Sequence, residues 1–137
     1  MVPTILHTAH VVGNLLWLGA ILAVTLVLAQ KIGSAKERGA LGRRVYLHIA
    51  VPAFAVVFVM GLARLLLSPG MYFVQSKYMH AKLTLALVVI AVHHIVGARA
   101  KRMASGQTDS PGPIVLMGAL ILSAGVGSAV LALLKPF

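Results

Sequence analysis

Eight ionisable side chains stand inside long apolar runs of this sequence, and their types are the ones that carry chemistry. Six are histidines, which bind metals and haem iron through a ring nitrogen. The other two are an arginine and a lysine, which bind carboxylates and phosphates. Because ionisable groups are costly inside apolar helices, each is a candidate functional residue. The eight are His7, His10, His48, Arg64, His80, Lys82, His93 and His94.

The spacing of these residues suggests how they would meet if the runs are helices, in which each residue turns by about 100°. His10 and Trp17 are seven residues apart and share a face. His80 and His94 are fourteen apart, so they lie within about 40° of one face and about 21 Å apart along the axis. This spacing resembles that of helices carrying two stacked haems. It predicts a haem site from His10 and His80, and a second from His48 and His94.

Other interpretations of the same residues stay open. Any of the histidines could form an interhelical hydrogen bond instead of binding a metal, and for His48 and His93 the two interpretations weigh about equally. Arg64 and Lys82 could extend their charged ends to the membrane surface. Trp17 could pack in the core or stack on a flat ligand.

The elements that must position these side chains are four apolar runs. Hydrophobic residues make up 60% of the 137 residues and charged residues only 10%, whereas soluble domains have about 25% charged residues. Each run has about 20 residues or more, enough to cross a bilayer. Short connections make neighbouring helices antiparallel. We therefore predict a single all-α transmembrane domain, an up-down-up-down four-helix bundle with spans at about 4–29, 46–67, 78–98 and 114–134.

The basic residues set the predicted orientation. Twelve Lys and Arg face two acids, a formal net charge of +10. Most of them flank the apolar runs, so membrane topology explains the charge and nucleic acid is not an expected partner. The connections at 31–44 and 99–113 hold most of these basic residues, which by the positive-inside rule places them in the cytoplasm. Both termini and the connection at 68–77 are then on the outer side.

The fourth run has small residues at every fourth position, which lets helix backbones approach closely. Such spacing serves packing within one chain or between two copies, so a homo-oligomer is one expectation. The two rows are Ala119, Ser123 and Gly127, and Ala124, Ser128 and Ala132.

Four stretches of the chain, taken in order, resemble one family. They are HVVGNLLWLG, RRVYLHIAVPA, MHAKLTLALVVIAVHHIVG and the terminal LLKPF, beginning at His10, Arg43, Met79 and Leu133. Together they are similar to the HemJ-type protoporphyrinogen IX oxidases, small haem-containing proteins of bacterial membranes. The similarity covers nearly the whole chain.

The resemblance implies six-electron oxidation of protoporphyrinogen IX to protoporphyrin IX in the bacterial inner membrane. It also implies a haem b cofactor and a membrane quinone as electron acceptor. The family's important His and Trp of the first span match His10 and Trp17, and its His and Lys of the third span match His80 and Lys82. The expected roles are haem ligation by His10 and His80, carboxylate binding by Lys82 with Arg64, and stacking by Trp17.

Two further functions remain as alternatives. The segment 105–117, SGQTDSPGPIVLM, departs from the family pattern, and an electron-transfer cytochrome b would need only the histidine pairs. A copper-handling protein similar to the CopD-type domains is the third hypothesis, because imidazole and thioether groups suit copper(I). Cysteine is absent, which excludes disulfides, thiolate haem ligation and iron–sulfur clusters.

Overall fold

Four long helices make up most of the protein. The computed structural model describes residues 2–75 and 77–134, and every regular element in this part of the chain is helical. The four are long and apolar enough to cross a bilayer, which confirms the all-α class and indicates a multi-pass membrane protein. These apolar helices cover Thr4–Ala29, Ala35–Leu67, Tyr78–Ala104 and Ile114–Leu134. The first lies within α1 (Val2–Ala29), and the last two are α4 and α5.

The second long helix begins earlier than the sequence predicted. Residues 31–44 were expected to form a connection, but α2 spans Ala35–Val45. Ser34 and Glu37 form a capping box: the Ser34 hydroxyl accepts from the Glu37 N–H at 3.1 Å, and the Glu37 carboxylate accepts from the Ser34 N–H at 2.8 Å. These bonds satisfy N–H groups that a helix start leaves free. The polar helix α2 therefore continues without a break towards the apolar span.

A widened turn joins α2 to α3 (Val51–Leu67). In this π-helical segment, η1 (Tyr46–Ala50), the Val51 N–H donates to the Tyr46 carbonyl five residues back. Pro52 follows directly and has no N–H to donate. The local adjustment of the helix thus lies in the turn before the Pro52 ring.

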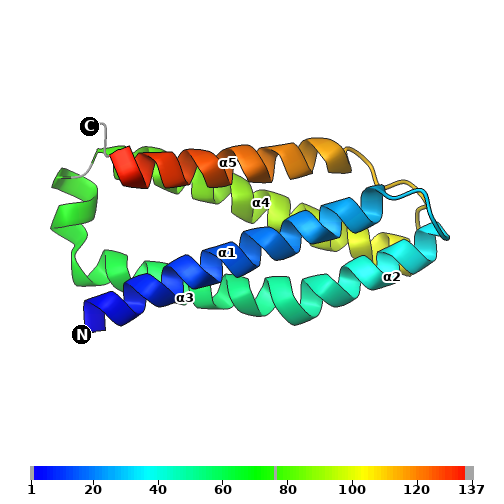
Figure 1. The fold of residues 1–137 in the computed structure, drawn as a ribbon, viewed down its shortest axis with the longest axis horizontal. Coiled ribbons are helices and arrows are strands. Elements are labelled where there is room, and N and C mark those ends of the chain that lie inside the picture. Colours follow the sequence, from blue (N-terminus) through cyan, green and yellow to red (C-terminus); the bar gives the residue numbers. More distant parts are fainter. Residues whose placement is uncertain (1, 76, 135–137) are drawn as a thin grey trace.

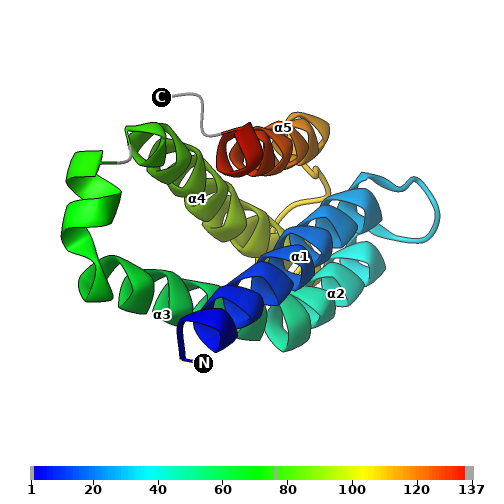
Figure 2. The same ribbon diagram turned by 60° about the vertical axis from the view of Figure 1, so that its left-hand side comes forward.

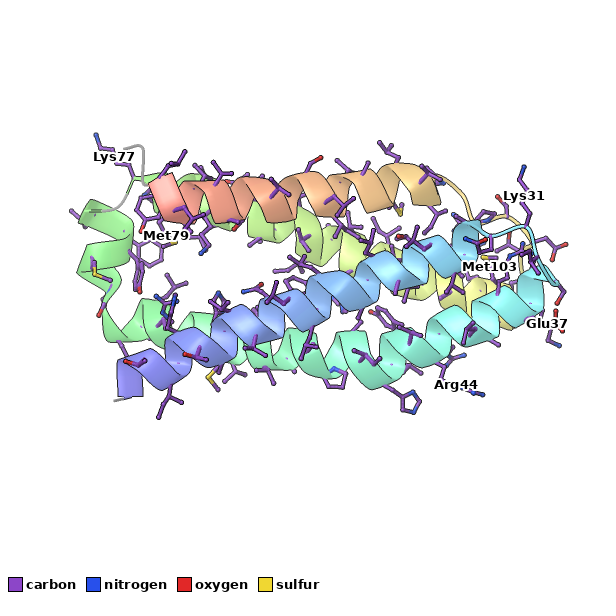
Figure 3. All side chains as sticks on the ribbon, in the orientation of Figure 1. Lys31, Glu37, Arg44, Lys77, Met79 and Met103 are labelled. Carbon is purple, nitrogen blue, oxygen red and sulfur yellow. The ribbon has the colours of Figure 1, made fainter. Side chains whose placement is uncertain are left out.

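The bundle has two ends that differ in shape. The connections at 30–34 and 105–113 lie at one end, called here the loop end, with Lys31, Glu37 and Met103 (Figure 3). The opposite, η2 end holds the short π-helical segment η2 (Met71–Gln75), with Lys77 and Met79 nearby (Figure 3). α3 and α4 diverge towards η2 (Figures 1 and 2), while α1 packs on α3, α5 and η1.

The most tightly packed core lies in the half of the bundle nearer the loop end. α2 approaches α4 so closely that a Cβ at Gly39 would overlap the Ala104 backbone. Likewise, a Cβ at Gly97 would overlap the Tyr46 ring. The largest fully buried side chains are Ile21, Val24, Leu28, His93, Val96, Met103, Ile114 and Ile121.

Candidate functional site

His10 projects from α1 against the middle of α3. Its Nδ1 lies 3.2 Å from the Val57 carbonyl oxygen. Its ring sits over Gly61, where a Cβ would come within 3.1 Å of the ring Cε1. A nitrogen that faces a carbonyl carries the proton, so Nδ1–H donates and the lone pair stays on Nε2. This arrangement is typical of histidines that bind a metal, because the carbonyl fixes the ring and leaves the other nitrogen available.

Two cations lie within the range at which their charges act on His10. The charges of Arg64 on α3 and Lys82 on α4 are close enough to interact with the His10 ring and with each other. Both side chains are half-buried. The Arg64 guanidinium donates to the Tyr72 hydroxyl at 3.0 Å and lies 5.8 Å from the centre of that ring. Three elements, α1, α3 and α4, together with η2, thus assemble one basic site at the η2 end.

The basic site has no acidic side chain to balance its charge. The sequence contains only two acids, Glu37 and Asp109. Glu37 lies at the loop end (Figure 3), where it caps α2. Asp109 lies in the connection at 105–113 at that same end (Figure 1). Partly buried cations without a counter-ion bind anions readily, since an anion offsets their desolvation. The site is therefore suited to a ligand with carboxylate or phosphate groups.

His80 lies at the start of α4 and faces η2. Its Nε2 is 3.2 Å from the Phe73 carbonyl oxygen, and the Phe73 ring centre is 6.4 Å from its own. The side chain is exposed, and Nδ1 is the nitrogen left for a ligand. His80 and Lys82 are thus both near the η2 end, as their positions in the sequence predicted.

A second polar group lies inside the bundle and joins Trp17, His93 and Tyr46, of which the first two are buried and Tyr46 is half-buried. Trp17 Nε1–H donates to His93 Nδ1 at 3.1 Å, and His93 Nε2 lies 3.2 Å from the Tyr46 hydroxyl. Because the indole is only a donor, His93 Nδ1 is the acceptor and Nε2 carries the proton. Both ring nitrogens of His93 are therefore engaged in hydrogen bonds, which favours the interpretation of His93 as an interhelical hydrogen-bonding residue of the core.

Aromatic rings surround His93 on several sides. The Tyr46 and Phe54 rings each have their centres 4.8 Å from that of His93, at interplanar angles of 33°. Phe54 also packs on Trp17 at 5.1 Å. With 4% of its surface exposed, Trp17 belongs to the core in this structure. The role of Trp17 in stacking on a macrocycle stays a prediction.

The two histidines expected to form an inner haem site lie on the protein surface. His48 Nδ1 is 2.9 Å from the Arg44 carbonyl oxygen, and the side chain is exposed. His94 is exposed as well, with its ring 5.0 Å from His93 and 6.0 Å from Phe54. The described contact of His48 is within its own helix, whereas His94 contacts His93 beside it and Phe54 of α3. Their pairing around a haem stays a prediction.

Sequence reasoning did not single out Tyr72 or the Tyr46–His93–Trp17 chain as parts of a site. Tyr72 falls in a segment that was expected to be a connection. Its contact with Arg64 could not be predicted, because residues in a connection follow no helical periodicity. In the sequence, Gly97 is the local signal for the contact between Tyr46 and His93. A glycine one helical turn after His93 makes room for a ring from another helix. The residues Lys135, Pro136 and Phe137, which end the resembling LLKPF, lie outside the described residues.

Within the described residues, no group of three or more His, Cys, Asp or Glu side chains is placed to hold a metal ion. A haem needs only one or two axial ligands, so this finding leaves haem binding open. Comparison of the chain with protein-family models, with curated proteins and with solved structures gives no match.

Proposed function

We propose that this protein is a membrane oxidoreductase that binds haem b and oxidises protoporphyrinogen IX. The observation that carries the proposal is the half-buried site of His10, Arg64 and Lys82, which joins an available imidazole nitrogen to two cations without an acidic side chain. A tetrapyrrole with two propionates matches this combination, because its carboxylates complement the cations and its iron accepts the imidazole. The resemblance of the chain to the HemJ-type oxidases supports the same reaction.

The residues fit a haem by their chemistry. His10 would ligate the iron through Nε2, oriented by its bond to the Val57 carbonyl, and His80 is the second candidate ligand. Arg64 and Lys82 would hold propionates of haem or substrate, with Tyr72 fixing the guanidinium of Arg64. Bound haem would supply one-electron transfer. An inner haem between His48 and His94 is the less supported site, since both side chains lie on the surface.

The overall reaction sets what the protein must accept and release. Oxidation of protoporphyrinogen IX removes six electrons and six protons, which three membrane quinones would take up as they become quinols. The half-buried cations would orient the substrate carboxylates, so that the reacting macrocycle lies towards the apolar interior. The electron acceptor and the porphyrin are thus the proposed partners within the bilayer.

The proposed topology is up-down-up-down, with the loop end in the cytoplasm and both termini on the outer side of a bacterial inner membrane. The strongest support is the clustering of basic residues in α2 and at the end of α4. Self-association through α5 also stays a proposal. Ala119 and Ser123 of one small-residue row are exposed, whereas Ala124 of the other row is buried.

The experiment is a reduced-minus-oxidised spectrum of the purified protein, with haem quantified per chain, for wild type, His10→Ala and His7→Ala. His7 is the matched control, since it is exposed and one turn away on the same helix. We expect a b-type signal that His10→Ala removes and His7→Ala retains. No haem after expression with ample haem supply contradicts the proposal. Haem without porphyrinogen turnover would favour an electron-transfer cytochrome b.

A further inference from the structure

A groove at the loop end lies between the second and third long helices. Arg43, Tyr46 and Leu47 line it from α2 and η1, and Gly97, Ala98 and Lys101 line it from α4; its volume is about 300 Å³. This volume is at the lower limit of pockets that bind small molecules, about 300 Å³. A neighbouring groove along Arg44, Val45, His48 and Ile49 is lined by a single helical stretch. Only the first groove is therefore formed by two packed elements.

The wall of this groove is held in place from inside the bundle. The Tyr46 ring lies over Gly97, where a Cβ would overlap it, and its hydroxyl meets the ring of fully buried His93. A Tyr held at both its ring and its hydroxyl loses little freedom when a ligand binds beside it. The groove is therefore preorganised even though it is open to the surroundings.

The groove is lined by two cations and by no acidic side chain. Arg43 and Lys101 stand on opposite sides of it. Of the two acids in the sequence, Glu37 is bound to Ser34, and Asp109 lies in the connection at 105–113. An anion between the two basic groups would gain charge-assisted hydrogen bonds from both.

The position of the groove in the bundle narrows the choice of anion. Arg43 and Lys101 lie in the parts of their long helices nearer the loop end, where basic residues of α2 and α4 gather. Basic residues that flank membrane spans are typically at the level of the lipid headgroups. The exposed side chains of Leu47 and Ala98 continue the lining as an apolar surface. A ligand that fits has a phosphate at one end and hydrocarbon at the other. Basic pockets between membrane helices bind anionic headgroups in this way.

We propose that this groove is a binding site for one anionic phospholipid, with its phosphate between Arg43 and Lys101 and an acyl chain along Leu47 and Ala98. The bound lipid joins the two helices that carry Tyr46 and His93, and so stabilises the buried hydrogen-bonded chain. The proposal is independent of haem or porphyrin binding, because its residues all lie at the loop end.

The test measures thermal unfolding of the full chain in neutral detergent with added phosphatidylglycerol or phosphatidylcholine. Trp17 is the only tryptophan and donates to His93, so its fluorescence reports on the packed region directly. We expect phosphatidylglycerol to raise the Tm by several degrees and phosphatidylcholine to leave it unchanged. Equal effects of the two lipids would overturn the proposal, as would an equal rise with inorganic phosphate alone.

Two variants locate the effect. Arg43→Ala with Lys101→Ala should raise the phosphatidylglycerol concentration needed for half the shift at least tenfold. Lys31→Ala with Lys36→Ala removes the same charge at the same end, outside the groove, and should leave that concentration unchanged. If both double variants lose the response equally, general surface charge explains it and the groove is not the site. Ala98→Phe, which fills the groove, keeps both cations and leaves Trp17 as the only tryptophan, should also abolish the response.

Discussion

Polar groups inside the bundle have hydrogen-bond partners towards the loop end, whereas the cations towards the η2 end have no acidic partner. Towards the loop end, His93 has a partner on each ring nitrogen and aromatic rings around it. Towards the η2 end, the cations Arg64 and Lys82 share a half-buried space with His10 and have no acidic side chain nearby. Complete satisfaction stabilises a fold, whereas unbalanced charge costs stability and binds ligands. The difference separates a structural half from a half suited to function.

Packing follows the same division. The largest fully buried apolar side chains come from the later half of α1, the later half of α4 and the first half of α5. Towards η2 the helices α3 and α4 diverge (Figure 2). A region with fewer packed contacts opens at lower free-energy cost. We therefore expect substitutions near the loop end to act on stability, and those near η2 to act on ligand binding.

The largest effect on stability is expected from Gly97→Ala. The added Cβ would overlap the Tyr46 ring, which the His93 bond holds in place, so the loss should be about 3 kcal/mol. Thermal unfolding in detergent, followed by circular dichroism, measures it. Gly19→Ala is the control, because nothing lies within 4 Å of a Cβ there. An equal Tm for both variants would show that the Tyr46 contact is not tightly packed.

A smaller loss is expected from Trp17→Phe. The substitution leaves His93 Nδ1 buried without a donor, at a cost of about 1–3 kcal/mol. If Trp17 acts by packing on Phe54 and bonding His93, as its described contacts indicate, haem content is unchanged in this variant. Phe58→Leu, at an exposed position of α3, is the comparison. Loss of haem or of turnover with an unchanged Tm would instead place Trp17 at the macrocycle.

A loss of about 1 kcal/mol is expected from Ser34→Ala, because the first turn of α2 then has a free N–H group. Ser105→Ala removes a hydroxyl at a helix end of the same region and serves as the control. Unfolding of both variants in detergent compares them. If Ser34→Ala is neutral, the stability of the loop end comes from its core alone.

The smallest effect on stability is expected from Lys82→Met at the η2 end. Removing one of two neighbouring cations relieves their repulsion, so the Tm should stay the same or rise. Haem should be retained and protoporphyrinogen oxidation should fall at least tenfold, since a carboxylate loses its partner. A large drop in Tm would show that the η2 end is structural as well. Unchanged turnover would remove Lys82 from the proposed site.

The sequence predicted the spans well because apolar runs of this length have one stable form in a bilayer. It missed the helix over residues 35–45, since polar residues there carry no hydropathy signal and the helix start is marked only by the Ser34–Glu37 capping box. It paired Lys82 with Arg64 for carboxylate binding, and in the structure both charges act on His10. The pairing of His10 with His80 around a haem stays a prediction.

The hydrogen-bond partners of the histidines could not be predicted from the sequence. His93 and His94 are adjacent, yet one is fully buried and the other exposed. Periodicity alone predicts which residues share a face of a helix. It does not predict which neighbouring helix that face packs against. Tyr46 reaches His93 only because a widened turn and Gly97 bring the two helices together, and both depend on tertiary packing.

The widened turn η1 also sets the angular phase of the second long helix. One residue added to a helical turn offsets everything before it by about 100° and about 1.5 Å. That offset lets α3 face α1 at Val57 while α2 faces α4 at Gly39. Deleting a single residue from Tyr46–Ala50 would restore regular winding and turn Gly39 away from α4. The extra residue in the π-helical turn thus sets the rotation of α2 relative to α3, so that α2 packs on α4 while α3 packs on α1.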